Sequence, residues 1–207
     1  LLDSQGRITL DTPEALRALE NYRETYSYSD RTIYDFWKNA LEGFADGSAA
    51  MTVVFINYAS HILNSQMSRI AGKLGFAPVP GGRPLLGGGV IGITQGCTCP
   101  ETACAFFQWL YADLVAPVFT MLGGLSPCRS AYTNRDISEQ YPWLSTARKS
   151  FPTAQRRSSS TYYQNFSELQ LETILASRVQ QAVLGVCSPE EALKQAQADC
   201  DSYFQPW

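Results

Sequence analysis

Apolar residues recur every three or four positions in four stretches of the chain, a spacing that predicts amphipathic helices. The first stretch, residues 11–26, opens with Thr12 as a candidate N-cap and Pro13 at the first helical position. Its apolar face consists of Leu16, Leu19 and Tyr22. We therefore expect a helix that begins near residue 12.

The end of the chain repeats this pattern. Ser188 is a candidate N-cap, Pro189 opens the helix, and Glu191 stands where a capping box has its acidic residue. Another helix is expected before it, over residues 166–185, with Gly185 as its stop signal. The residues at helical spacing in that stretch are Leu171, Ile174, Leu175, Arg178, Val179 and Ala182.

The remaining helix is predicted to begin at Pro100 and to bend or break near Pro117, because proline removes a backbone donor from a helix interior. Its apolar surface is wide, which predicts that the helix is well buried. That surface contains Ala103, Phe106, Phe107 and Leu110.

Short apolar runs between the helices are rich in Val, Ile and Phe and are bounded by Gly or Pro, as β-strands are. They comprise residues 51–59, 73–80 and 89–94. The first run follows Gly47 and three small residues and contains Asn57 and Tyr58 near its end, so we expect it to deliver these two side chains to a ligand cleft. Helices and strands together indicate an α/β or α+β protein in which helices dominate.

Two connections between these elements have a distinct composition. Residues 80–89, PGGRPLLGGG, contain glycines that let a backbone approach a ligand closely. Residues 147–165 are polar and irregular, which is typical of a surface crossing or loop.

Composition narrows the class of protein. With 207 residues, 45% of them hydrophobic and 17% charged, the chain can bury a core as one large domain or two small ones. A net charge of -3 supplies no basic field, so we expect no nucleic-acid surface in this chain. The chain begins without Met or a signal-peptide pattern, and we interpret it as a mature or excised piece of a longer protein.

Three of the six cysteines fall in the sequence GCTCPETAC, at Cys97, Cys99 and Cys104. This spacing, with His61 as the one histidine elsewhere, matches no common structural zinc pattern. We expect free thiols in a reducing setting, buried or at a helix start, and neither a metal nor another cofactor.

The sequence offers little for catalysis. It contains no G-x-S-x-G, H-E-x-x-H or Walker pattern, and a lone histidine such as His61 is more often a structural residue than a base. We therefore expect a protein that is not an enzyme, with no catalytic residues. A hydrolase or transferase that uses His61 is the weakest of the hypotheses.

Aromatic residues make up 12% of the chain, and such side chains stack on the flat apolar faces of sugars while amides and hydroxyls bind the sugar hydroxyl groups. Trp37 and Trp109 lie on predicted helix faces and are interpreted as packing residues. The tyrosines and Asn57 in or beside irregular segments are equally compatible with packing and with ligand contact. These tyrosines are Tyr58, Tyr162 and Tyr163.

The order of several stretches resembles the C-terminal half of family 1 extracellular solute-binding proteins, the sugar-binding receptors of ABC importers that include maltose-binding protein. The stretches are DSQGRITLDTPEALRALENYRE, DFWKNALEGFADGSAAMTVVFINYA, KLGFAPVPGG, LLGGGVIGIT, ETACAFFQWLY and VLGVCSPEEALKQAQADCDSYF. Together they span nearly the whole chain.

This resemblance implies a fold and a set of ligand-binding residues. The fold is α/β, a helix-rich, periplasmic-binding-protein-like (type II) C-terminal lobe with a short mixed sheet over residues 1–207, of which about 100–125 belong in relatives to the other lobe. Asn57 falls nearest the position of a sugar-stacking aromatic residue in relatives. The implied ligand-binding residues are Asn57, Tyr58, Gly87, Gly88, Gly89, Tyr162, Tyr163 and Asn165.

The resemblance also implies partners and a location. The expected function is non-catalytic binding of a small solute, most simply a mono- or oligosaccharide, in a receptor that docks on an ABC permease outside the cell, in the periplasm or anchored to the membrane as a lipoprotein. Family members are about twice as long as this chain, so an apolar face left without its second lobe favours a homodimer of the isolated lobe. The alternative is the ligand-sensing domain of a cytoplasmic transcription or signalling regulator.

Overall fold

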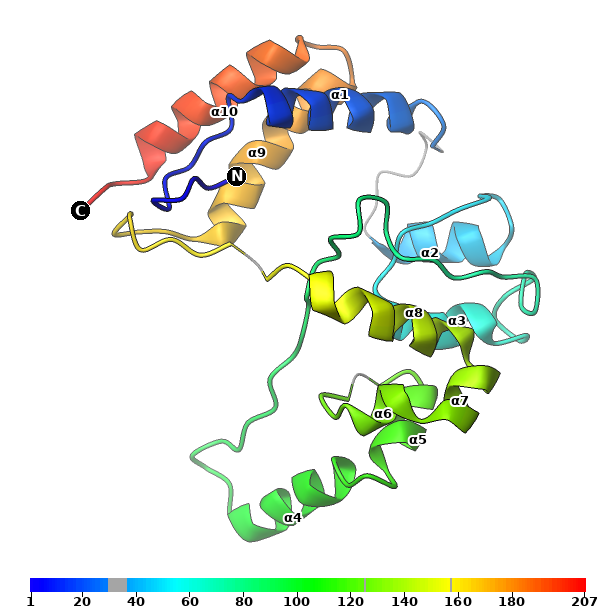
Figure 1. Ribbon diagram of the computed structural model, residues 1–207. Helices are drawn as coiled ribbons and strands as arrows, with labels where there is room; N and C mark the ends of the chain where they lie inside the picture. The colour runs from blue at the N-terminus through cyan, green and yellow to red at the C-terminus, as the bar shows by residue number, and fades with distance from the viewer. Residues whose placement is uncertain (30–36, 125, 157) are drawn as a thin grey trace. The chain divides into compact units, whose positions relative to one another are not determined.

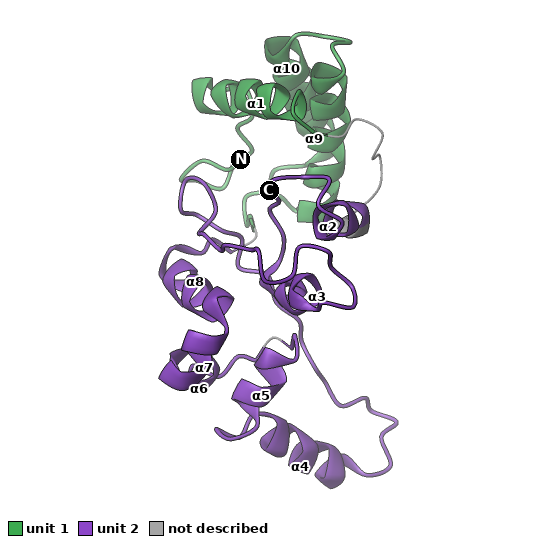
Figure 2. Cartoon of the chain, turned by 90° about the vertical axis from the view of Figure 1, so that its right-hand side faces the viewer, with its two compact units in different colours: residues 1–32, 157–207 green, residues 33–156 purple. Residues whose placement is uncertain are grey.

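The computed structural model describes residues 1–29, 37–124, 126–156 and 158–207 and divides into two compact units (Figure 1 and Figure 2). Unit 1 consists of Leu1–Thr32 and Arg157–Trp207, the first and last parts of the chain. Unit 2 consists of Ile33–Arg156. Each unit has a buried hydrophobic core of its own.

Unit 1 contains three helices that pack on one another: α1 (Pro13–Tyr26), α9 (Glu168–Val183) and α10 (Pro189–Tyr203). The predicted start of α1 is confirmed, since the Thr12 side chain accepts a hydrogen bond from the Ala15 N–H. Ser188 caps α10 in the same way, by accepting from the Glu191 N–H. The Glu191 carboxylate accepts instead from the Gln195 side chain, so the cap is made by the serine.

The core of unit 1 lies where the three helices meet the chain termini. Leu171 and Ala182 of α9 are buried, as the helical spacing predicted. Gly185, at φ 76°, follows the end of α9 in the left-handed region that favours glycine. Near the N-terminus, Ile8 and Leu10 are buried against this core.

Unit 2 is built from short helices. They are α2 (Trp37–Ala45), η1 (Ile56–Tyr58), α3 (Ala59–Leu63), α4 (Pro100–Leu110), α5 (Ala116–Met121), α6 (Ser130–Thr133), α7 (Arg135–Gln140), α8 (Pro142–Ser150) and η2 (Phe151–Thr153). Trp143, Leu144 and Ala147 of α8 form the centre of its core with small residues from α3, α5 and α6. The helix break predicted near Pro117 is observed, because α4 ends at Leu110 and Pro117 lies in the first turn of α5.

The predicted strands are not formed. Residues 51–55 form no strand and lead into η1 and α3, and residues 73–80 and 89–94 contain no strand either. Among the described residues, β pairing is limited to the isolated bridges Leu2↔Ile8, Leu85↔Gln155 and Tyr163↔Pro206. A strand needs a neighbour to bond to, and the described part of the chain provides none for these runs.

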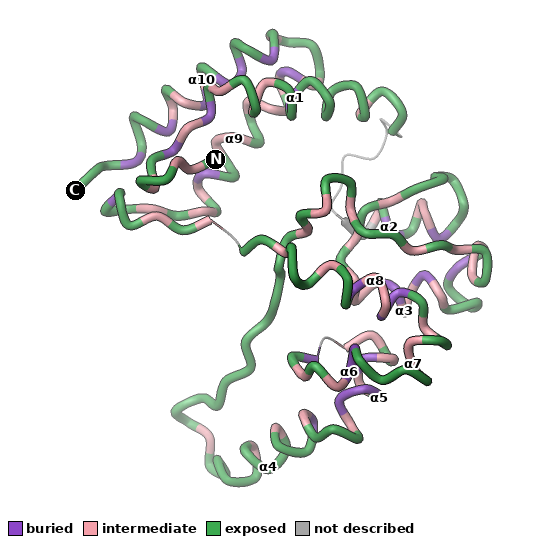
Figure 3. Tube along the Cα trace, viewed as in Figure 1, coloured by how far each residue is buried: buried purple, intermediate pink, exposed green. Residues whose placement is uncertain are grey.

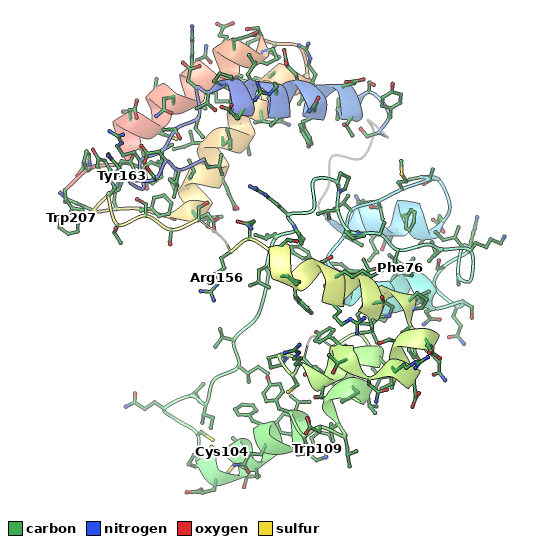
Figure 4. All side chains as sticks on the ribbon, in the orientation of Figure 1. Phe76, Cys104, Trp109, Arg156, Tyr163 and Trp207 are labelled. Atoms are coloured by element: carbon green, nitrogen blue, oxygen red, sulfur yellow. The ribbon has the colours of Figure 1, made fainter. Side chains whose placement is uncertain are left out.

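The prediction that α4 is well buried is wrong. Much of α4 is exposed (Figure 3), and Leu110 is its one buried residue. Phe106 and Trp109 are 51% and 58% exposed. Trp109 is interpreted from the sequence as a packing residue. Its ring lies 5.8 Å from the Phe106 ring, measured between centroids, and its side chain projects from α4 (Figure 4). The corresponding interpretation of Trp37 falls on a side chain outside the described residues.

Candidate functional site

The predicted ligand residues Asn57 and Tyr58 lie in η1, between residues 51–55 and α3. Both residues are half-buried. The Asn57 carbonyl accepts a hydrogen bond of 3.3 Å from the Ser60 hydroxyl, which ties η1 to the first turn of α3. A 3₁₀ turn, rather than the end of a strand, therefore positions this pair.

Gly123 packs closely against this turn, and the sequence reasoning missed it. Its φ of 95° is in the left-handed region, and a side chain added there would collide with the Ser60 hydroxyl and lie 3.5 Å from the Asn57 carbonyl oxygen. Only glycine fits this combination of backbone angle and space. The positive φ cannot be read from the sequence, where Gly123 stands beside Gly124 in an ordinary turn-like pair.

The three predicted glycines of the 80–89 connection differ from one another. A Cβ at Gly87 would lie 3.3 Å from the Phe55 ring, so this glycine brings its segment close to the residue that precedes η1. Gly88 and Gly89 have open space around them and are exposed. The structure therefore brings Gly87 to the neighbourhood of Asn57 and Tyr58 through Phe55.

The predicted residues Tyr162, Tyr163 and Asn165 belong to unit 1. Tyr163 is buried among aromatic rings, and its hydroxyl accepts a hydrogen bond from the Ile8 N–H at 3.0 Å. Its ring meets that of Phe204 at 5.6 Å between centroids (labelled Tyr163 in Figure 4). The Tyr163 hydroxyl thus bonds the N-terminal segment, at Ile8, to the core of unit 1.

Asn165 bonds to the C-terminal segment. Its side-chain N–H donates to the Tyr203 carbonyl at 2.9 Å, and its side-chain oxygen accepts from the Gln205 N–H at 2.9 Å. Both polar ends of the amide are therefore engaged within unit 1.

Of the two tyrosines, Tyr162 is the exposed one, and it lines a surface depression of about 320 Å³. The depression is bordered by Asp3, Arg7, Thr9, Tyr162 and Asp201. Arg7 donates from Nε to Asp3 at 2.8 Å, and its backbone N–H bonds to the same carboxylate at 2.9 Å. The backbone bond is the largest cause of the lowered pKa of Asp3, so the carboxylate is ionised at neutral pH.

A second depression, of about 460 Å³, lies between α9 and α10 and includes an ion pair that links the two helices. Arg178 Nε donates to the Asp199 carboxylate at 2.7 Å, and its Nη1 atom lies 3.0 Å from the Gln195 side-chain oxygen. The hydrogen bond to Asp199 raises the pKa of Arg178. This explains a charged residue among the apolar positions of α9, because Arg178 points toward α10.

The cysteines are free, and their exposure differs. Cys99 and Cys104 at the start of α4 are exposed, whereas Cys200 in α10 is buried. Burial, with the charges of Asp201 and Asp199, raises the pKa of the Cys200 thiol from its ordinary value of 9.0 to about 11. Across the described ranges, no three His, Cys, Asp or Glu side chains gather as a metal-ligand set.

This difference predicts a pattern of thiol modification. At neutral pH, a thiol with a pKa of about 11 forms about a hundredfold less thiolate than a thiol with the ordinary pKa of 9.0. Burial also keeps an alkylating reagent away from the sulfur atom of Cys200. We expect iodoacetamide at pH 7.5 to label Cys99 and Cys104 in minutes and Cys200 only after urea unfolding, as measured by peptide mass spectrometry. Equal labelling of Cys200 and Cys104 in the folded chain would contradict the structure.

The same shift predicts the direction of a pH effect. Because the folded thiol has the higher pKa, the unfolded chain loses its proton first, so the contribution of Cys200 to stability is present below pH 9 and declines as the pH rises through about 11. A Cys200→Ala variant is expected to lose this part of the decline in urea titrations between these pH values.

None of the helices in the described residues is both long and apolar enough to cross a membrane. The candidate groups described above include amide, hydroxyl, carboxylate, guanidinium and aromatic side chains. Such groups can bind and stack on a polyhydroxylated molecule.

The model of one protein family, described as bacterial extracellular solute-binding protein, matches residues 2–146, which is more than half of the chain. The chain belongs to this family. The resemblance found in the sequence is therefore confirmed at the level of the family.

Solved structures of solute-binding proteins match this chain over almost its whole length. Maltose-bound MalE3 of T. maritima is 22% identical, with a TM-score of 0.77, and the match covers 97% of this chain and 53% of MalE3. An ABC transporter solute-binding protein of Agrobacterium radiobacter K84 in complex with ribitol is 23% identical, with a TM-score of 0.70, and the match covers 98% of this chain and 53% of that protein. An ABC transporter solute-binding protein of Agrobacterium vitis S4 with bound D-mannitol is 20% identical, with a TM-score of 0.69, and the match covers 98% of this chain and 55% of that protein.

These matches confirm the predicted fold class, a helix-rich fold of the periplasmic-binding-protein type. They also show that the chain spans about half the length of the solute-binding proteins that it matches.

Proposed function

We propose that this chain is the C-terminal lobe of an ABC importer substrate-binding protein and contributes to non-catalytic binding of a carbohydrate or polyol. The observation that carries this proposal is the family match over residues 2–146. The three matched structures support the solute class, because each is named with a polyhydroxylated molecule: maltose, ribitol or D-mannitol. The family description supports an extracellular or periplasmic location, to which we add a lipid anchor and a permease partner as parts of the proposal.

Asn57 and Tyr58 are the residues that we propose as principal solute contacts from unit 2. An amide binds vicinal hydroxyl groups, and a tyrosine ring stacks on the apolar face of a sugar. The side chain of Asn57 is half-buried and forms no hydrogen bond with the other described residues, so it has bonding capacity for a ligand. We propose further contacts from the backbone groups of Gly87, Gly88 and Gly89, of which Gly87 lies close to Phe55, the residue before η1.

The unit 1 residues enter this proposal differently. Tyr162 offers an exposed ring at the edge of the 320 Å³ depression, and we propose it as a further stacking surface for a solute. The Tyr163 ring contacts that of Tyr162 at 4.9 Å between centroids. The polar atoms of Tyr163 and Asn165 bond to Ile8, Tyr203 and Gln205, so we propose that these two residues hold the segment that carries Tyr162.

Titration calorimetry with maltose, ribitol and D-mannitol tests the function, on the longest polypeptide that contains this chain. We expect heat with at least one polyhydroxylated solute, and about a tenfold loss of affinity, equivalent to about 1.4 kcal/mol, for each of Asn57→Ala and Tyr58→Ala. Tyr22→Ala is the matched control, because Tyr22 is 57% exposed on α1, and it should bind like the parent. Absence of heat with a broad panel of sugars and polyols would refute the function, whereas binding that neither variant weakens would refute only the assigned contacts.

A further inference from the structure

Three cysteine thiols lie close together in the sequence around the start of α4. Cys97 is half-buried, whereas Cys99 and Cys104 are exposed. Cys99 is the N-cap residue of α4, and Cys104 lies in the second turn of this helix (labelled Cys104 in Figure 4). These thiols form a group of reactive side chains that the proposed solute binding does not use.

The family of this chain and its cysteines point to different surroundings. The cysteines predicted a reducing setting, but the matched family is described as extracellular. Outside the cell, disulfides form and persist because thiols meet oxidants there. Exposed thiols react first, since an oxidant can reach them. The distances between the cysteines then decide which of them can pair.

Cys97 and Cys99 meet the distance requirement of a disulfide, whose Cα atoms lie about 4.4–6.8 Å apart. Residues two positions apart are separated by at most about 7 Å in a fully extended chain. The chain bends at Thr98, between the two cysteines, and this bend shortens their separation. A turn comes just before it, in which the Cys97 N–H donates to the Thr94 carbonyl at 3.0 Å.

The other cysteines of unit 2 are placed along α4. The Cys99 carbonyl accepts from the Ala103 N–H at 3.3 Å, so the helix has begun at that point. From Cys99 to Cys104 a helix rises by about 7.5 Å, which exceeds the Cα separation that a disulfide spans. The Cys128 thiol donates to the Tyr111 carbonyl at 3.3 Å, at the far end of the same helix. Tyr111 lies about 10 Å beyond Cys104 along the helix axis.

The two cysteines of unit 1 are separated by α10. Cys187 comes directly before the N-cap Ser188, and Cys200 is 1% exposed near the other end of the helix. A rise of about 1.5 Å per residue puts about 18 Å between Ser188 and Cys200. Cys187 and Cys200 therefore cannot pair with each other, and burial shields Cys200 from an oxidant.

We propose that Cys97 and Cys99 form a site of thiol–disulfide exchange with small external disulfides, for which oxidised glutathione is the probe. The exposed Cys99 thiolate attacks one sulfur atom of the external disulfide, whose S–S bond breaks and releases one small thiol. The Cys97 thiolate then attacks the Cys99 sulfur and releases the second small thiol. The two cysteines lose two electrons and two protons as their S–S bond forms, and the external disulfide gains them as two thiols.

The pair is suited to reversible exchange rather than to permanent stabilisation. Its ring encloses one intervening residue, Thr98, and strained disulfides are more easily reduced. Closing so short a loop also removes little entropy from the unfolded chain. We therefore expect reduced glutathione to reverse the oxidation, and the urea midpoint to differ little between the two forms.

Mass spectrometry can identify the pair because Glu101 lies between Cys99 and Cys104. The longest polypeptide that contains this chain is equilibrated with mixtures of oxidised and reduced glutathione and quenched with excess N-ethylmaleimide. It is then digested with a glutamate-specific protease, which places Cys97 and Cys99 on one peptide and Cys104 on the next. We expect the peptide that ends at Glu101 to lose two hydrogen atoms as the oxidant increases, with no link to another peptide.

Two serine variants distinguish pairing from independent oxidation of each thiol. Cys97→Ser removes the thiol that resolves the mixed disulfide, so glutathione bound at Cys99 is expected to increase at least about fivefold. Cys104→Ser is the matched control, because it removes a thiol of the same segment that lies outside the pair. It should leave the Cys97–Cys99 bond and its dependence on glutathione unchanged.

Three results would overturn the proposal. One is a disulfide that links the peptides on the two sides of Glu101, which would make Cys104 the partner. Another is a link from this segment to Cys128 or Cys187. The third is an equal amount of glutathione at Cys99 in the parent and in Cys97→Ser, which would show that Cys97 does not resolve the mixed disulfide. None of these readouts depends on a bound solute, so a failure of the proposed solute binding is distinguishable from a failure of the exchange site.

Discussion

Replacing Phe204 with alanine is expected to lower the free energy of unfolding of unit 1 by about 3–5 kcal/mol. Phe204 is 1% exposed at the end of α10, and its ring lies 5.6 Å from Tyr163, 5.8 Å from Phe166 and 5.0 Å from Tyr203, measured between centroids. The substitution removes a ring from the centre of an aromatic cluster and leaves a cavity that the helices cannot fill without moving.

Urea titration followed by far-UV circular dichroism measures this loss, and hydrogen exchange of α9 and α10 assigns it to unit 1. Trp207→Ala is the control, because Trp207 is 84% exposed and its removal is expected to change stability by no more than about 0.5 kcal/mol. A loss for Phe204→Ala as small as that of the control would show that the cluster is not the core of unit 1.

The second large effect is expected at Trp143 in α8. Its side chain is 1% exposed among Ala59, Ala116, Tyr132 and Ala147, and alanine in its place is expected to cost unit 2 about 3–5 kcal/mol. The indole N–H is buried and has no hydrogen-bond partner in the described part of the chain. A buried polar group without a partner costs about 1–3 kcal/mol, so Trp143→Phe removes an unfavourable group while it keeps most of the apolar volume.

We therefore expect Trp143→Phe to cost less than about 1.5 kcal/mol, far below the cost of Trp143→Ala. Trp109→Ala, at a tryptophan that is 58% exposed, should remain within about 0.5 kcal/mol of the parent. Circular dichroism is the suitable signal, since these substitutions alter the fluorescence directly. If phenylalanine proved as damaging as alanine, the indole N–H would have a partner, such as a bound water, that it loses on substitution.

Helix starts could be predicted from the sequence because the signals that set them are local. Thr12 and Ser188 each cap a helix by bonding to an N–H three residues ahead, and the prolines that follow fit the first turn without breaking a bond. The stop at Gly185 is equally local, since only the backbone angle of one residue is required.

The predicted strands and the buried α4 failed for a common reason. Residues 51–55 and Phe106 have the composition of buried elements, yet burial and strand pairing depend on a second segment at the right place. The composition of a segment makes it able to form a strand, but a strand forms only if a second segment lies beside it to pair with. The candidate site shows the same limit, because the roles of Tyr163 and Asn165 follow from contacts with residues near both ends of the chain.

The helix starts, the helix-rich class and the resemblance to solute-binding proteins follow from the sequence alone, because caps and periodicity are properties of nearby residues and the order of motifs is read directly along the chain. Tertiary structure alone decided that η1 positions Asn57 and Tyr58, that Gly123 packs against that turn, and that Arg178 bonds across to Asp199. The Gly123 contact and the Arg178–Asp199 bond join residues far apart in the chain, which no local pattern encodes. The turn at η1 is local, but it replaces a predicted strand that has no partner among the described residues.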